Sequence, residues 1–213
     1  KNVITLPHQT HICYCHTPMR YAWDLTHEYL RTLPSIFKIF AHKILHDIRI
    51  WDYVSSSRVD VFIANSKTVA KRIKRYYNKD AVVIYPPVDV GKFRVGKGGD
   101  YFITVSRLVP YKKVDVIVSA FNELSLKLLI VGDGPEMGMI KKIAGKNVEI
   151  LGWVEDKTLV ELLSNARAFV YCAYEDFGIS SVEAMASGLP VIAYGYGGVS
   201  ETVVDGETGI FFY

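Results

Sequence analysis

The stretch Tyr174–Pro190 reads YEDFGISSVEAMASGLP, and it decides the fold class. The apolar run Ala168–Cys172 before it is typical of a buried strand, and Val191–Ala193 after it predicts another. Between them, Ser180–Ser187 has the composition of a helix that a glycine and a proline then end. A strand, a helix and a second strand joined by short loops predict two parallel strands with a crossover helix.

The same alternation of strands and helices extends outward through residues 87–213. Further strands are predicted at Tyr101–Val105, Lys127–Val131 and Val148–Leu151, and further helices at Val114–Leu124, from about Glu136, and at Thr158–Asn165. This order predicts an α/β fold, a Rossmann-like parallel sheet with helices on both faces.

Upstream, the pattern continues with strands at His11–His16, Val59–Ala64 and Ala81–Tyr85, and with helices at Ser35–Tyr53 and from Ser66, as N-cap, to Tyr77. The dipeptide Pro86-Pro87 is extended and stiff, so it is the predicted hinge between a domain of residues 1–86 and a domain of residues 87–213.

Composition excludes several classes of protein. The net charge of +3 over 213 residues is too weak to argue for nucleic acid. No apolar run reaches the roughly 20 residues of a membrane-spanning helix. The three cysteines form no CxxC pair, which favours reduced thiols in a cytosolic protein. Neither HExxH nor a Cys/His cluster is present, so no metal site is predicted.

Two cations follow the strand that ends at Val105. Arg107 and Lys112 lie in the loop at its carboxyl end, where open α/β sheets bind their ligands. The planar fork of an arginine and the point charge of a lysine together suit a diphosphate. A solvated basic loop explains the same residues equally well.

Two carboxylates belong to the opening stretch. Glu175 is expected in the loop after a strand, and Glu183 about one turn into the next helix. The spacing Ser180-x-x-Glu183 matches a capping box, and on spacing alone we favour that role for Glu183. Glu175 alone is equally compatible with an exposed loop acid.

Two glycine-rich turns follow other strands. Gly132-Asp133-Gly134-Pro135 is not a dinucleotide fingerprint, and a tight turn is the favoured role of Asp133. Gly195–Gly198 is compatible with a loop that wraps a ligand and with a flexible connection. His16 closes an upstream strand, a position where a histidine is more often structural.

Taken in order, these motifs carry a resemblance. SRLVPYKK, GDGP, LGWV, EDFGISSVEAMASGLPVIA and GGVSETVVDGETG resemble the carboxyl-terminal domain of family 4 retaining glycosyltransferases, which have the two-domain GT-B architecture. Upstream, CHTPMRYAWD, RVDVFIANSKTVAKRIKRYY and YPPVD are similar to the mannosyltransferase branch that builds O-antigen and related polysaccharides. The resemblance implies a nearly complete carboxyl-terminal domain and part of an amino-terminal domain, in a chain cut from something longer.

The resemblance also implies roles for individual residues. Arg107 and Lys112 bind the donor diphosphate, Glu183 the ribose hydroxyls and Glu175 the transferred sugar. The backbone of Phe177, Gly178 and Ile179 meets the distal phosphate and the sugar, and the backbone of Val154 meets the base. His16 lies by the sugar, and Ser106 and Gly132 complete the predicted donor site.

The implied reaction is the transfer of a hexose, in particular mannose from GDP-mannose, to a glycan or lipid-linked acceptor with retention of configuration. The resemblance implies neither metal nor cofactor. The expected location is the cytoplasm, with peripheral contact at the inner face of the membrane as an alternative. A nucleotide-sugar-binding fragment without catalysis is the alternative. A nicotinamide-dependent oxidoreductase is disfavoured because the glycine fingerprint is absent.

The helix predicted at Ser35–Tyr53 has two interpretations. Its apolar residues recur at helical spacing with lysine, arginine and histidine between them. Packing inside the domain is favoured, since ordinary core helices show this period. Contact with an anionic membrane surface is the other interpretation.

Overall fold

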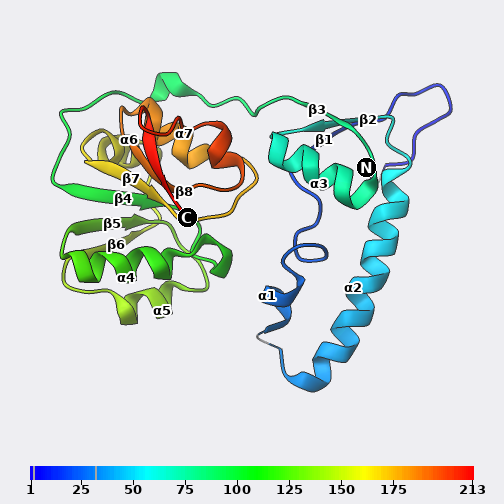
Figure 1. Ribbon diagram of the computed structural model, residues 1–213, viewed down its shortest axis with the longest axis horizontal. Coiled ribbons are helices and arrows are strands. Elements are labelled where there is room, and N and C mark those ends of the chain that lie inside the picture. Colours follow the sequence, from blue (N-terminus) through cyan, green and yellow to red (C-terminus); the bar gives the residue numbers. More distant parts are fainter. Residues whose placement is uncertain (2, 32) are drawn as a thin grey trace. The chain divides into compact units, whose positions relative to one another are not determined.

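The second unit, Pro87–Tyr213, is built on a six-stranded parallel sheet (Figure 1). The computed structural model describes residues 1, 3–31 and 33–213. The strand order is β6-β5-β4-β7-β8-β9, with β4 Tyr101–Val105, β5 Lys127–Val131, β6 Val148–Gly152, β7 Ala168–Tyr171, β8 Val191–Tyr194 and β9 Gly209–Phe212. The helices are α4 Val114–Leu124, α5 Met137–Ile143, α6 Asp156–Ser164 and α7 Ile179–Ala186, with short 3-10 turns η1 Val90–Lys92, η2 Pro110–Lys112 and η3 Gly198–Glu201.

Helices cover both faces of this sheet because its strands are apolar on both faces. Leu128 and Ile130 of β5 pack in one cluster with side chains of α4 and α5. Leu129 and Val131 point to the opposite face and pack in a second cluster with side chains of α6 and α7 (Figure 1). The predicted α/β fold, a parallel sheet with helices on both faces, is confirmed.

The first unit, Lys1–Pro86, has a three-stranded parallel sheet in the order β1-β2-β3. Its strands are β1 Ile12–Cys15, β2 Val61–Ala64 and β3 Ala81–Val83, and its helices are α1 Thr26–Arg31, α2 Ser35–Ser56 and α3 Lys67–Tyr77. The Ser66 hydroxyl accepts a hydrogen bond from the backbone N–H of Val69 at 3.0 Å, so the predicted N-cap of α3 is confirmed. The short helix α1 was not predicted.

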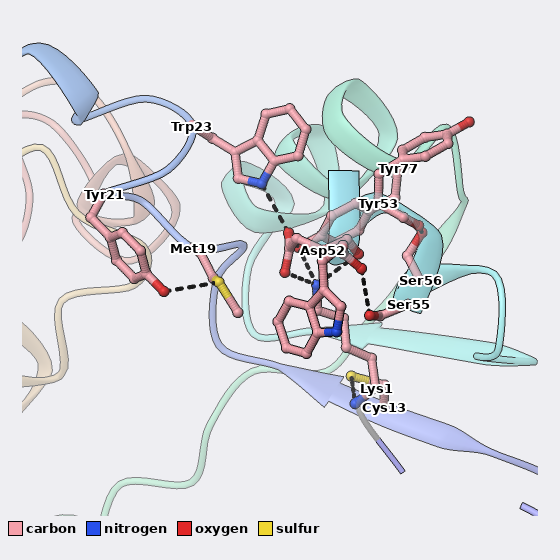
Figure 2. A network of polar contacts seen from close by, with 11 residues as sticks. Lys1, Cys13, Met19, Tyr21, Trp23, Asp52, Tyr53, Ser55, Ser56 and Tyr77 are labelled. Carbon is pink, nitrogen blue, oxygen red and sulfur yellow. Dashed lines mark hydrogen bonds and ion pairs between the residues drawn. The ribbon is translucent and has the colours of Figure 1, made fainter. Parts of the chain in front are cut away.

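A buried carboxylate holds the first unit together (Figure 2). Asp52 of α2 is fully buried and accepts hydrogen bonds from the Trp23 indole at 2.9 Å and the Tyr77 hydroxyl at 2.7 Å. The Lys1 ammonium pairs with the same carboxylate. Burial, followed by the bond to Asp52, raises the pKa of Tyr77, so the phenol remains a donor. This network ties α2 to α3 and to the loop before α1.

The other end of α2 exposes apolar side chains. Ile36, Phe37, Ile39 and Phe40 are all more than half exposed, and the fully buried residues of α2 are confined to its last turns. In Figure 1 the first turns of α2 extend past the small sheet. The favoured interpretation, packing of the apolar residues within the domain, therefore fails here for this half of the helix. Among the described residues, no helix has the length and apolar character required to span a membrane.

Candidate functional site

The loops after β4, β5 and β6 are joined by backbone hydrogen bonds at the carboxyl edge of the six-stranded sheet. The N–H of Ser106 donates to Val131 O at 3.0 Å, and the N–H of Gly132 donates to Gly152 O at 2.7 Å. The N–H of Leu108 donates to Asp133 O at 2.9 Å. These bonds bring the predicted residues Ser106 and Gly132 to one place.

Gly132 is required for this close approach. Its φ is +130°, and an added Cβ would lie 1.9 Å from the carbonyl oxygen of Ser106. At Gly134 a Cβ would lie 2.3 Å from the carbonyl oxygen of Leu108. The Asp133 carboxylate accepts from the N–H of Gly134 at 2.6 Å, which is the turn role expected of it. The glycines of the GDGP turn therefore allow this turn to contact the loop after β4.

The predicted cation Lys112 and the predicted acid Glu175 meet in the structure. Lys112 ends η2, and its ammonium contacts Oε1 of Glu175, with both side chains largely shielded from solvent. Tyr171, the last residue of β7, donates its hydroxyl to Oε2 of the same carboxylate. The pairing of β4 with β7 makes this possible, because it places their following loops side by side.

Tyr171 is a site residue that the sequence did not single out. Burial, then the negative charge of Glu175, raises its pKa well above 10, so the hydroxyl stays protonated and donates. The available signal was a tyrosine at the carboxyl end of a strand, four residues before an acid. The pattern of apolar residues in the strand does not distinguish this tyrosine from an aromatic residue of the core.

The second glycine loop is pinned against the loop of Glu175. The N–H of Gly198 donates to the carbonyl of Glu175 at 2.8 Å, and an added Cβ at Gly198 would lie 2.3 Å from Asp176 O. Gly197 has a φ of +87°, and its Cβ would lie 2.6 Å from Glu175 O. The interpretation of this loop as a flexible connection is therefore wrong. Its glycines let two site loops touch.

The capping box predicted from Ser180 and Glu183 is also wrong. Gly178, at a φ of +89°, is the N-cap, so α7 begins at Ile179 and Ser180 already lies inside the helix. No side chain caps this end; the Ser181 hydroxyl donates to Gly178 O at 2.6 Å instead. A left-handed glycine lets the chain turn into the helix sooner than a serine cap would. Early N–H groups of a helix lack intrahelical acceptors, so this end can bind an anion.

Glu183 is half-buried on α7, and its carboxylate accepts no hydrogen bond from the residues that the structure describes. Burial raises its pKa above the ordinary 4.5, the charge of Asp156 raises it further, and Lys92 opposes both. A cavity of about 360 Å³ is lined by both of these charged residues, together with Arg94, Lys157, Val160 and Glu161. A carboxylate with unused acceptor capacity is suited to hydroxyl donors.

The remaining predicted residues differ in burial and in the unit to which they belong. Arg107 is exposed, and the Ser106 Oγ is buried with no hydrogen-bond partner among the described residues. Val154 is half-buried, two residues after Gly152 at a φ of +74°. His16 belongs to the first unit, where it is exposed and its ring lies edge-on to Tyr14 at 5.2 Å.

The part of the chain that the structure describes contains no group of three or more His, Cys, Asp or Glu side chains placed to hold a metal ion. Cys13, Cys15 and Cys172 are free thiols.

Comparison with solved structures places the fold among GT-B glycosyltransferases. The chain resembles the Anabaena protein HepE, solved in complex with UDP and glucose, with a TM-score of 0.73 and 20% identity over 96% of this chain and 58% of HepE.

The chain belongs to the family of group 1 glycosyltransferases, whose family model matches residues 89–213. It is 31% identical to an uncharacterized glycosyltransferase of Methanocaldococcus jannaschii over 73% of this chain and 46% of that protein. It is 25% identical to the alpha-1,3/1,6-mannosyltransferase ALG2 of Candida glabrata over 68% of this chain and 44% of that protein. The chain thus spans less than half the length of these relatives.

Proposed function

We propose that the protein transfers a hexose from a nucleotide sugar to a glycan or lipid-linked acceptor, with retention of the anomeric configuration. The observation that carries the proposal is the meeting of Lys112, Glu175 and Tyr171 at the carboxyl edge of the sheet. The site unites a cation for phosphate with a carboxylate for sugar hydroxyls, in a domain of the group 1 family.

The chemistry requires stabilisation of a leaving nucleoside diphosphate as its negative charge develops. Lys112 and Arg107 supply positive charge, and the amino end of α7 supplies N–H groups from Phe177, Gly178 and Ile179. Fixed donors of this kind act in place of a metal, and we propose that the reaction needs no metal ion. Glu175 orients the transferred sugar, Glu183 binds the ribose, and the Val154 backbone lies against the base.

For the donor we propose GDP-mannose. The upstream motifs CHTPMRYAWD and YPPVD support mannose, and one relative carries the name of a mannosyltransferase. The structure of HepE with UDP and glucose makes UDP-glucose the competing donor.

Isothermal calorimetry with GDP, UDP, GDP-mannose and UDP-glucose, in buffers with and without EDTA, tests the site. Lys112→Ala is expected to weaken binding of the preferred diphosphate roughly 10- to 100-fold, the worth of one charge-assisted hydrogen bond. Lys141→Ala, on the exposed side of α5, is the matched control and leaves binding unchanged. Equal binding by wild type and Lys112→Ala would remove this lysine from the site, and binding that EDTA abolishes would refute the metal-free site.

A nucleotide-sugar-binding fragment without catalysis is the second candidate. The observation behind it is that the chain spans 46% of one relative and 44% of another. Transfer of radiolabelled sugar to a membrane extract separates the two candidates. Binding without transfer by this chain supports the fragment, and transfer supports the enzyme.

We also propose a cytoplasmic protein that contacts the inner face of the membrane through α2. The exposed apolar side chains Ile36, Phe37 and Phe40 lie on a helix that also carries Lys38 and Lys43, a composition suited to an anionic lipid surface.

Co-sedimentation with phosphatidylglycerol vesicles tests this contact. Phe37→Ser/Phe40→Ser is expected to reduce the bound fraction severalfold, whereas Val116→Ser, an exposed site on α4, leaves it unchanged. Binding that is absent, or that does not depend on anionic lipid, would end the idea.

A further inference from the structure

We propose that Tyr171 is a positioning residue that orients the Glu175 carboxylate toward the transferred sugar. The inference rests on the proposed function and adds to it a residue that acts through Glu175. Tyr171 is the last residue of β7, so the end of this strand would contribute to sugar recognition.

The direction of the Tyr171 hydroxyl is fixed by the core. The residue is 2% exposed, and its ring stacks on buried Phe169 with centroids 6.1 Å apart. At the start of α7, an added Cβ on Gly178 would lie 3.3 Å from the Tyr171 hydroxyl oxygen. The phenol is thus enclosed by the strand beneath it and by the turn into α7. Its hydroxyl donates to Oε2 of Glu175 from this enclosed position.

The two oxygens of Glu175 have different donors. Lys112 contacts Oε1 and Tyr171 donates to Oε2. A lysine on a flexible stem acts as a point charge and tolerates rotation of the carboxylate, whereas a packed phenol is directional. An ionised carboxylate offers about four lone-pair positions, so two donors leave acceptor capacity for sugar hydroxyls. The phenol therefore sets the plane in which that remaining capacity lies.

A partly buried tyrosine of this sheet satisfies its hydroxyl without a carboxylate. Tyr101 of β4 donates its hydroxyl to the backbone carbonyl of Leu162 at 2.8 Å. Burial raises the pKa of both phenols, so both remain donors. The distinguishing feature of Tyr171 is that its acceptor is the acid predicted to contact the sugar. Tyr101→Phe is thus a control that removes a partly buried tyrosine hydrogen bond away from Glu175.

Calorimetry compares GDP with GDP-mannose, and UDP with UDP-glucose, for wild type, Tyr171→Phe, Glu175→Gln, the double variant and Tyr101→Phe. Tyr171→Phe is expected to keep its affinity for the nucleoside diphosphate within twofold. Its affinity for the preferred sugar nucleotide is expected to fall about tenfold, as in Glu175→Gln. The double variant is expected to lose no more than Glu175→Gln alone, because the phenol acts through the carboxylate. Tyr101→Phe lowers the melting temperature and changes neither affinity.

The outcomes separate this inference from the function on which it rests. Wild type that binds neither diphosphates nor sugar nucleotides refutes the proposed function and the positioning role together. Wild type that binds sugar nucleotides, with an unchanged affinity ratio in Tyr171→Phe, refutes the positioning role alone. Additive losses in the double variant also refute it, because they show that the two side chains act independently.

Discussion

The half-buried side chain of Glu183 lowers the stability of the folded protein when it is ionised. It is half-buried on α7 without a hydrogen-bond partner among the described residues, and burial raises its pKa above 4.5. A group whose pKa is raised in the folded state destabilises that state once it ionises. No side chain caps the amino end of α7, so Glu183 gains no capping hydrogen bond that would offset this cost.

Glu183→Gln is expected to raise the free energy of unfolding at pH 7 by less than about 1 kcal/mol, because solvent screens a half-exposed charge. In wild type the folded state binds the proton more tightly, so stability falls as pH rises from 4.5 through the raised pKa. The Glu183→Gln variant does not lose stability in this way. Its stability relative to wild type therefore increases between pH 4.5 and the raised pKa, and the difference vanishes below pH 4.5.

Urea unfolding of both proteins from pH 3.5 to 8 measures this difference. Glu161→Gln, on the exposed surface of α6, is the control and shows little difference at any pH. A Glu183→Gln variant that is less stable than wild type at pH 7 would contradict the view that the Glu183 carboxylate has no hydrogen-bond partner in the described part of the chain.

Calorimetry of Glu183→Gln with GDP is expected to show weaker binding than that of wild type.

At the scale of elements, the site depends on how closely the loops at the carboxyl edge approach one another. Gly132 and Gly138 lie on either side of the turn into α5 and test this directly. An added Cβ at Gly132 meets the Ser106 carbonyl at 1.9 Å, whereas at Gly138 nothing lies within 4 Å. The first glycine is required by contact, and the second is not.

Gly132→Ala is expected to destabilise the second unit by about 2 kcal/mol or more, since the loops must separate and the φ of +130° disfavours alanine. Gly138→Ala, inside a helix, is expected to stabilise it by roughly 0.5–1 kcal/mol. Thermal unfolding followed by circular dichroism measures both. Similar melting temperatures for the two variants would show that the loops are not in contact.

At the scale of the whole molecule, the two units have separate sheets and separate cores. The first has the Asp52 network and a small cluster around Phe62 and Ile73, and the second has clusters on both faces of its sheet. Lys112, Glu175, Tyr171 and Glu183 all belong to the second unit. A nucleotide that binds this unit therefore stabilises it specifically.

Scanning calorimetry is expected to show two unfolding transitions. GDP at a hundredfold excess over its Kd adds about 2.7 kcal/mol to the transition of the second unit and leaves the other in place. Hydrogen exchange assigns each transition to residues 1–86 or 87–213. Equal stabilisation of both transitions would show that the nucleotide site extends over both units.

The sequence by itself determined the elements of the second unit. The predicted bounds of β4, β5 and α4 agree with the structure, because a short apolar run and an amphipathic pattern of period 3.6 are both local in the sequence. The order of the motifs indicated a glycosyltransferase, and the model of the group 1 glycosyltransferase family matches residues 89–213. The N-cap at Ser66 was also predictable, since a capping hydrogen bond joins residues only three positions apart.

Only the tertiary structure decided which side chains meet. Lys112 and Glu175 are 63 positions apart, and their contact follows from the pairing of β4 with β7, which no local pattern encodes. The capping box failed because a left-handed Gly178 starts α7 before Ser180. Tyr171 looks like a core aromatic in the sequence. The role proposed for its hydroxyl depends on the loop after β7, which brings the Glu175 carboxylate within hydrogen-bonding distance.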